Sequence, residues 1–193
     1  MAGIAAKYKV KGTHITQVRV WIDKHLGEES FTTLTSQLSE TKGWPGVVLA
    51  GSWYDVEPLQ ALLSVASVRT KRSVELIATE IAEMNARTDL TSVYRAFLRL
   101  AGPPATLAAT ALLWKNYVAF ATAKAVKNER GAYIGECTGV PRHLLAWACG
   151  CWLGFIPTAI TLSGGKNCVG EIVARRRQQD SDLWMIEFAA KYD

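Results

Sequence analysis

The sequence predicts an α+β domain in which N-terminal helices precede a β-β-α-β-β antiparallel four-stranded sheet. Apolar residues recur at helical spacing as far as residue 117, and beyond it they alternate in short runs separated by polar turns. Helices followed by strands are typical of an α+β architecture. A long apolar stretch between the two pairs of strands predicts one helix packed on the sheet.

The N-terminal part contains segments whose apolar residues lie three or four positions apart, on one side of a helix. Gly27 ends the first segment, and Gly102-Pro103-Pro104 separates the last two. The expected N-caps are Thr13, Ser52, Ser73 and Asp89. The predicted helices are 13–25, 28–38, 53–68, 73–85, 90–100 and 106–117.

Four short alternating runs in the C-terminal part predict two β-hairpins. The runs 120–129 and 132–138 meet at a polar turn, which is typical of a hairpin. After an apolar helix that begins near Arg142, Gly164-Gly165 breaks the chain. The runs 168–176 and 183–192 then form the second hairpin around another polar turn.

The segment 144–165 contains no charged residue, and its Gly150 and Gly154 have the spacing of small residues in paired membrane helices. Pro157 and the absence of a second such segment argue against a membrane span. A helix buried on nearly all sides is also apolar all round. We therefore predict a core or dimer-interface helix, with Gly150 and Gly154 as interface residues and no integral membrane insertion.

The composition predicts one domain over residues 1–193, with a helical part at about 10–117 and the sheet with its central helix at about 118–193. A chain of 193 residues that is 49% hydrophobic can bury a core without a disulfide or metal. The N-terminus lacks the pattern of a signal peptide, and the four cysteines lie in apolar or strand-like surroundings. These features predict a cytoplasmic protein with reduced thiols.

No catalytic constellation is visible, so the sequence predicts a protein that is not an enzyme. His14, His25 and His143 are far apart, and no nucleophile motif of the form G-x-S-x-G occurs. The net charge is +5, but the Lys and Arg residues are scattered along the chain. Their densest run, the three arginines at 175–177, is typical of a solvated hairpin tip. We expect no nucleic-acid partner, and Cys149-Gly150-Cys151 lacks the ligand spacing of a zinc site.

Short motifs in a consistent order resemble a paralogous family of uncharacterised proteins first collected from myxobacteria. The match runs from about residue 9 to the end. That family is similar in fold to a superfamily of 4-vinyl reductase domains, haem-nitric-oxide sensor domains and TRAPP vesicle-tethering subunits. The motifs are Val10-Lys11-Gly12, Gly27-Glu28-Glu29, Trp53-Tyr54, Val93-Tyr94-Arg95, Phe97-Leu98-Arg99 and Leu113-Trp114 followed by Tyr117.

The resemblance implies helices followed by a twisted antiparallel sheet, often as a dimer, with an interior that holds haem, a phenol or an acyl chain. The zinc-binding members carry a Glu and two Cys along the last hairpin. Here Glu171 matches the first, but Arg175 and Leu183-Trp184 stand where the cysteines would be, so zinc is disfavoured. The haem sensors need a proximal His on a helix, and no residue matches it, so haem is also disfavoured.

Two functional hypotheses follow. The first is a non-catalytic regulatory or sensory domain that binds a small hydrophobic molecule in an apolar pocket between helices and sheet. The alternative is a protein-interaction adaptor that acts through a homodimer or a partner protein. Aromatic residues at helical spacing are also typical of ordinary core packing. The candidate pocket residues are Trp114, Tyr117, Phe120, His143, Trp147, Trp152 and Phe155.

Overall fold

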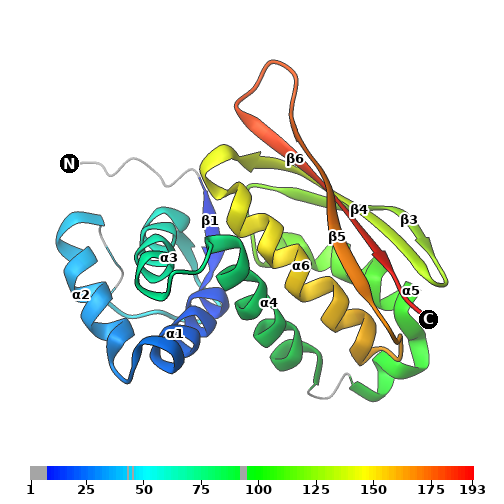
Figure 1. Ribbon diagram of the computed structural model, residues 1–193, viewed down its shortest axis with the longest axis horizontal. Helices are drawn as coiled ribbons and strands as arrows, with labels where there is room; N and C mark the ends of the chain where they lie inside the picture. The colour runs from blue at the N-terminus through cyan, green and yellow to red at the C-terminus, as the bar shows by residue number, and fades with distance from the viewer. Residues whose placement is uncertain (1–7, 43, 45, 92–94) are drawn as a thin grey trace. The chain divides into compact units, whose positions relative to one another are not determined.

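The computed structural model describes residues 8–42, 44, 46–91 and 95–193 (Figure 1). The chain divides into two compact units. Unit 1 consists of Met1–Val74 and Asn116–Phe120, and unit 2 consists of Glu75–Lys115 and Ala121–Asp193. The expected single domain over residues 1–193 stays a prediction.

Unit 1 combines helices with a short two-stranded sheet. The strands β1 and β2 pair antiparallel, and Val10 of β1 forms a further bridge to Val118. Ile15, Val18 and Ile22 are buried along one side of the first helix, as their helical spacing predicts. The elements are β1 (Lys9–Lys11), α1 (Gly12–Leu26), α2 (Ser30–Lys42), β2 (Trp53–Asp55) and α3 (Val56–Thr70).

The three predicted helix starts in unit 1 differ from the structure by one to three residues, and the first and third show why. The first helix begins at Gly12, whose N–H donates to the Ser52 carbonyl, so a neighbouring loop caps it instead of Thr13. The helix predicted for 53–68 begins at Val56, where Asp55 Oδ1 accepts from the Glu57 N–H at 3.0 Å. The three residues expected at the start of that helix, Trp53–Asp55, instead form the strand β2. The prediction missed this strand because three residues are too few to show an alternating pattern.

The helices α4 (Val74–Thr91) and α5 (Arg95–Leu113) divide the chain differently from the prediction. α4 continues past the predicted end at residue 85, so Asp89 lies inside a helix and does not cap one. The predicted helices 90–100 and 106–117 largely join in α5, which is broken at Gly102 (φ 73°, ψ 174°). Residues 92–94, which include Val93 and Tyr94 of the family motifs, lie outside the described residues.

The four-stranded sheet of unit 2 confirms the predicted α+β fold. Its strand order is β3-β4-β6-β5, and every neighbouring pair is antiparallel (Figure 1). A single helix, α6, joins the two hairpins, as the β-β-α-β-β pattern predicts. The elements are η1 (Trp114–Asn116), β3 (Thr122–Glu129), β4 (Ala132–Pro141), η2 (Arg142–Leu144), α6 (Leu145–Leu162), β5 (Val169–Arg177) and β6 (Leu183–Lys191).

α6 is the central helix of unit 2. In the part of the chain that the structure describes, Arg142–Leu162 is the one helical stretch apolar enough to cross a membrane, and 67% of its most apolar window is buried inside the protein. Its glycines face α4 of the same chain. A Cβ atom at Gly150 would lie 2.6 Å from Ala78 Cβ, and one at Gly154 would lie 2.9 Å from Ala82 Cβ. The glycines therefore allow close packing of two helices within unit 2, and the expected interface between copies stays a prediction.

Candidate functional site

Aromatic side chains from separate elements of unit 2 gather into one group, called here the aromatic cluster. Trp114 of η1 and Trp152 of α6 have ring centroids 5.7 Å apart. Phe188 of β6 lies 6.0 Å from Trp152 and 6.4 Å from Tyr133 of β4. These separations are typical of contacting aromatic pairs. The aromatic cluster is therefore continuous from η1 to the sheet.

The strand β4 receives α6 through a notch at Gly135. Tyr133, Gly135 and Cys137 alternate on the buried face of β4. A Cβ atom at Gly135 would come within 2.6 Å of Trp152 Cζ3 and 2.7 Å of Tyr133 Oη. The missing side chain at Gly135 is therefore what gives the indole of Trp152 its place on the sheet.

The aromatic cluster contains buried polar atoms without a protein partner. The Tyr133 hydroxyl and the Trp114 Nε1 atom are both buried and form no hydrogen bond with the described residues. The Trp152 indole lies beside the Cys137 thiol without reaching a well-formed hydrogen bond. Buried polar atoms of native proteins nearly always have a partner, so these atoms are exceptions among the described residues.

The ionisable groups around the aromatic cluster remain neutral at physiological pH. Burial raises the pKa of Tyr133 to about 12 and that of the Cys137 thiol to about 12. Burial also raises the pKa of Cys151 and of Cys149, although Arg175 Nε approaches Cys149 Sγ at 3.3 Å and opposes the rise at Cys149. These thiols therefore remain protonated, and protonated thiols are poor nucleophiles and poor metal ligands.

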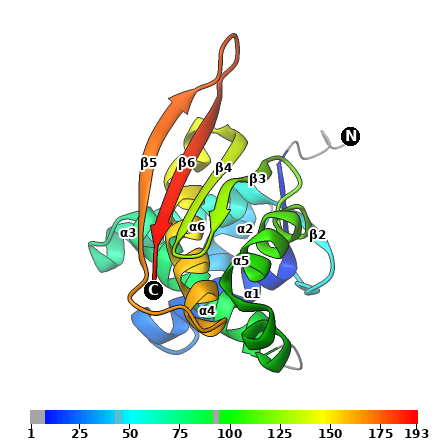
Figure 2. The same cartoon turned by 90° about the vertical axis from the view of Figure 1, so that its right-hand side faces the viewer.

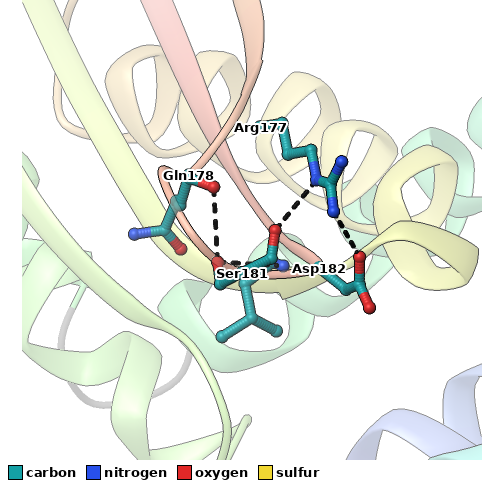
Figure 3. Close-up of polar contacts among 5 residues, drawn as sticks. Arg177, Gln178, Ser181 and Asp182 are labelled. Carbon is teal, nitrogen blue, oxygen red and sulfur yellow. Dashed lines mark hydrogen bonds and ion pairs between the residues drawn. The ribbon is translucent and has the colours of Figure 1, made fainter.

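The arginine run at 175–177 lies on β5, and each guanidinium has an acidic partner within unit 2. Arg177 donates to Asp182 Oδ1 at 2.7 Å and to the Ser181 carbonyl at 2.9 Å (Figure 3). The turn that carries these contacts ends a hairpin that projects beyond β4 (Figure 2). The run is therefore largely neutralised. The other two ion pairs are Arg175 with Glu75 at 2.8 Å and Arg176 with Glu187 at 3.7 Å.

The histidines occupy three different environments. His14 on α1 is 7% exposed, and burial lowers its pKa to about 4. His25 is exposed and stacks on Trp21 with ring centroids 4.2 Å apart, whereas His143 is exposed on η2. Within the described ranges no three His, Cys, Asp or Glu side chains gather in a way that could hold a metal ion. His14 is therefore the histidine whose buried ring is held neutral at pH 7.

The structure brings some of the predicted pocket residues together and separates others. Trp114 and Trp152 meet in the aromatic cluster, and Trp147 is buried elsewhere on α6. Phe155 packs against Ala86, Leu90 and Ala159, so it belongs to the contact between α4 and α6. His143 is exposed. Whether the predicted pocket exists stays a prediction.

Two of the expected pocket residues belong to unit 1. The Tyr117 carbonyl accepts from the Lys11 N–H at 2.9 Å, and the Phe120 ring lies 5.3 Å from that of Tyr8. Sequence reasoning also missed Tyr133 and Phe188 of the aromatic cluster. Both lie in runs whose alternate residues are buried, so the strand periodicity could have identified them.

No family model and no curated protein matches the chain. Solved structures do match along nearly its whole length. The Fe(II) unliganded H-NOX protein from K. algicida has a TM-score of 0.68 at 16% identity, over 95% of this chain and 96% of that chain. A mutant of T. Tengcongensis H-NOX has a TM-score of 0.60 at 14% identity, over 95% and 97%. A structure from work on heme distortion in the H-NOX family has a TM-score of 0.64 at 14% identity, over 95% of both chains.

These comparisons correct the expectation that haem is disfavoured. The matching structures are named as H-NOX (heme-NO-binding) proteins, and among them are an Fe(II) form and one concerned with heme distortion. The expectation was wrong because it relied on placing one proximal histidine by sequence position, which fails at 14–16% identity. The likeness to the myxobacterial, 4-vinyl reductase and TRAPP proteins is not among these findings. The chain has an H-NOX-like fold.

Proposed function

We propose that this chain is a non-catalytic sensory domain and that haem is its ligand. The observation that carries the proposal is the likeness to H-NOX structures over 95% of the chain, with TM-scores of 0.60 to 0.69. Bound haem supplies an iron centre that can take a small gaseous ligand, and the surrounding protein tunes this binding. The described residues offer no gathering of metal-ligating side chains that would suggest a catalytic metal instead.

The donor set of the chain favours an imidazole as the iron ligand. Haem iron is held in proteins by His, Cys thiolate, Met or Tyr. The buried thiol of Cys137 and the phenol of Tyr133 both have a pKa near 12, so neither supplies an anion at pH 7. His14 is buried with a pKa of about 4, and the neutral imidazole is the form that binds a metal. His14 is therefore the first candidate.

A haem titration of the purified protein tests the proposal. We expect a saturable Soret band at one haem per chain, and a shift of this band on reduction to Fe(II). His14→Ala should lose most of the band. His25→Ala is the matched control because His25 lies on the same helix and is exposed, so it should bind haem like the wild type.

The outcomes distinguish whether haem binds at all from whether His14 is the residue that holds its iron. Absence of a saturable Soret band in the wild-type protein would show that haem is not the ligand. A normal band in His14→Ala would leave haem in place and exclude His14, and His143→Ala would then be examined in the same titration.

An interaction adaptor remains the second candidate. Both edge strands of the sheet expose apolar side chains: Val126 on β3 is 54% exposed, and Val169 and Val173 on β5 are 70% and 51% exposed. Unpaired edge strands can pair with another chain. Light scattering during size exclusion measures the mass in solution, and a monomer at all accessible concentrations would exclude the homodimer form of this candidate.

A further inference from the structure

The chain between α2 and α3 in unit 1 exposes apolar side chains to solvent. The sequence has no charged residue from 43 to 54, and the described part of this stretch that ends with the first residue of β2, residues 46–53, is called here the apolar loop. Val47 is 76% exposed, Leu49 is 61% exposed and Trp53 is 37% exposed. Apolar side chains gathered on the surface mark a site that contacts a protein or a membrane.

The backbone of the apolar loop is fixed by the start of α1. The Ala50 carbonyl accepts from the Thr13 N–H at 3.1 Å, and the Ser52 carbonyl accepts from the Gly12 N–H at 3.0 Å. Gly12 makes this contact possible, because a Cβ atom there would overlap the Leu49 carbonyl oxygen. The exposed side chains are therefore held on a support that is already ordered, and little conformational entropy is lost when they bind.

Each backbone carbonyl of residues 49–52 has a hydrogen-bond donor. In addition to the two contacts with α1, the Leu49 carbonyl accepts from the Ser52 N–H at 3.1 Å, and the Gly51 carbonyl accepts from Lys11 Nζ at 2.7 Å. A segment enters the apolar region of a bilayer only where the protein itself satisfies the backbone polar groups. These four consecutive carbonyls meet that condition.

Aromatic rings and a lysine border the apolar loop. Tyr54 follows it, and the Tyr54 hydroxyl accepts from the Leu49 N–H at 2.6 Å. Lys11 Nζ lies over the ring of Trp53, 4.4 Å from its centroid. Trp and Tyr are enriched where a bilayer meets water, because their rings are apolar and their N–H or O–H is polar. A lysine beside them attracts the negative headgroups of anionic lipids.

The charge balance of unit 1 favours an anionic surface, although only weakly. Residues 1–74 contain nine Lys and Arg against six Asp and Glu, which is a net charge of +3. Asp55 follows the apolar loop, where it accepts from the Glu57 N–H and lies opposite Lys9 in the register of β1 and β2. An adjacent lysine therefore offsets this carboxylate. We expect the attraction to anionic lipids to be modest and to decrease at high salt.

The small size of the apolar loop favours a bilayer over a protein partner. Each partner of a stable protein pair buries about 800 Å² of surface. The partly exposed side chains of one short loop fall far short of this area. A bilayer requires less, because the burial of a few apolar side chains and the attraction to anionic headgroups add to each other.

We propose that the apolar loop inserts shallowly into the surface of a bilayer that contains anionic lipids. Val47 and Leu49 enter the boundary between headgroups and acyl chains, while Trp53 and Lys11 lie at the level of the headgroups. A loop of this length is too short to cross a bilayer, so the protein binds only its surface. The inference goes beyond the proposed haem function and does not depend on it.

Sedimentation of the full chain with vesicles made of equal parts phosphatidylcholine and phosphatidylserine tests the insertion. We expect Val47→Asp to bind these vesicles about tenfold more weakly than the wild type, because a charged side chain opposes entry into the bilayer. Val68→Asp is the matched control. Val68 lies on α3 in the same unit and is 78% exposed, so the variant adds the same charge outside the apolar loop and should bind like the wild type.

Fluorescence quenching locates the inserted residue. Vesicles with brominated acyl chains quench those tryptophans that reach the bilayer, so we expect quenching in the wild type and much less in Trp53→Phe. Trp184→Phe is the control, because Trp184 lies on β6 in unit 2 and its loss should leave the quenching unchanged. A purely structural role of Trp53 would not make quenching depend on that one ring.

Three results would overturn the inference. They are a wild-type protein that does not sediment with the vesicles, equal binding by Val47→Asp and Val68→Asp, and equal binding of the wild type to vesicles of phosphatidylcholine alone. Light scattering identifies a different occupant. A mass above that of one chain, reduced by Val47→Asp and kept by Val68→Asp, would assign the apolar loop to a second copy and reject the bilayer.

The haem titration gives an independent answer. Vesicle binding without a Soret band would retain this inference and reject haem as the ligand. A Soret band without vesicle binding would retain the proposed function and reject the insertion of the apolar loop.

Discussion

Gly135 shows how one missing side chain organises the interior of unit 2. A methyl group there would overlap Trp152 Cζ3 at 2.6 Å and Tyr133 Oη at 2.7 Å. Neither neighbour can retreat easily, because Trp152 is 3% exposed and Tyr133 is fully buried. The position of the tryptophan on the sheet therefore depends on the glycine.

We expect Gly135→Ala to lower the free energy of unfolding by about 1–3 kcal/mol, because an added methyl group overpacks a filled core. Urea denaturation monitored by circular dichroism measures the change. Gly51→Ala is the control, since a Cβ atom at Gly51 meets nothing within 4 Å. Equal stability of the two variants would contradict the conclusion that Gly135 has no room for a side chain.

His14 should make the stability of the ligand-free protein depend on pH. Burial lowers its pKa to about 4 from 6.5, so between these values the unfolded chain binds a proton that the folded chain does not. The contribution of the neutral His14 to the free energy of unfolding is therefore fully present above pH 6.5. It falls by about 3 kcal/mol as the pH drops to 4. Urea midpoints from pH 4 to pH 7 measure the slope, and His14→Gln should flatten it. An unchanged slope in the variant would assign the effect to other groups.

The burial of a single residue could be predicted from sequence only where the neighbouring residues in the chain determine it. Trp152 lies in a segment without charges, so its burial could be predicted. The burial of His14 could not, because a histidine suits a surface as well as a core. The notch at Gly135 depends on a side chain 17 positions later, and no local pattern reveals such a contact.

At the scale of elements, α5 depends on a backbone break that only glycine adopts without strain. Gly102 has φ 73° and ψ 174°, and Pro103 and Pro104 follow it. A Cβ atom at Gly102 would meet nothing within 4 Å, so any cost of a substitution comes from the backbone alone.

We expect Gly102→Ala to destabilise the protein by about 1–3 kcal/mol. Thermal unfolding by calorimetry gives the change. Ala108→Gly, at an exposed position of the same helix, is the comparison variant. It should lower the free energy of unfolding by about 1 kcal/mol, the usual cost of a glycine inside a helix. A Gly102→Ala variant as stable as the wild type would show that the break does not need glycine.

Element type was predictable and element boundaries were less so. The strands of unit 2 follow their alternation, and their ends differ from the predicted ones by at most three residues, as at β4, which ends at Pro141 instead of residue 138. Boundaries fail where tertiary contacts replace local signals, as at α1, whose first N–H groups donate to loop carbonyls. Gly102-Pro103-Pro104 was correctly predicted to interrupt regular structure, yet the helix resumes directly after it.

At the scale of the whole molecule, unit 1 is discontinuous in sequence. The segment 116–120 returns to it after the helices of unit 2 and lies along β1. Lys11 N donates to the Tyr117 carbonyl at 2.9 Å, and Ala119 N donates to the Lys9 carbonyl at 3.0 Å. The first 74 residues alone therefore keep β2 on one edge of β1 and lack the partner of its other edge.

We expect a fragment of residues 8–74 to unfold at a lower temperature than the same fragment joined to 116–120 by a flexible Gly/Ser linker. The added segment restores the backbone hydrogen bonds on the edge of β1 that β2 does not cover, and buried backbone groups left without these bonds destabilise the fragment. Thermal circular dichroism compares the two fragments, and identical melting curves would show that the returning segment does not contribute.

The division into units and the composition of the aromatic cluster could not be predicted from sequence. Both depend on contacts between distant residues: Trp114, Tyr133, Trp152 and Phe188 come from four different elements. Sequence reasoning identified the two tryptophans because Trp114 lies near the end of a predicted helix and Trp152 lies within the apolar segment 144–165. It placed Tyr117 and Phe120 beside them because they are near in the chain, although the structure assigns these two to unit 1.

The strand order of the sheet has a consequence for biosynthesis. β6 is made after the other strands, yet it lies between β4 and β5 and joins the two halves of the sheet. Until β6 leaves the ribosome, β5 has no neighbour and the apolar surface of α6 is only partly covered. The growing chain must then carry exposed apolar surface, so we expect chaperones to bind it most strongly between the synthesis of β5 and the emergence of β6.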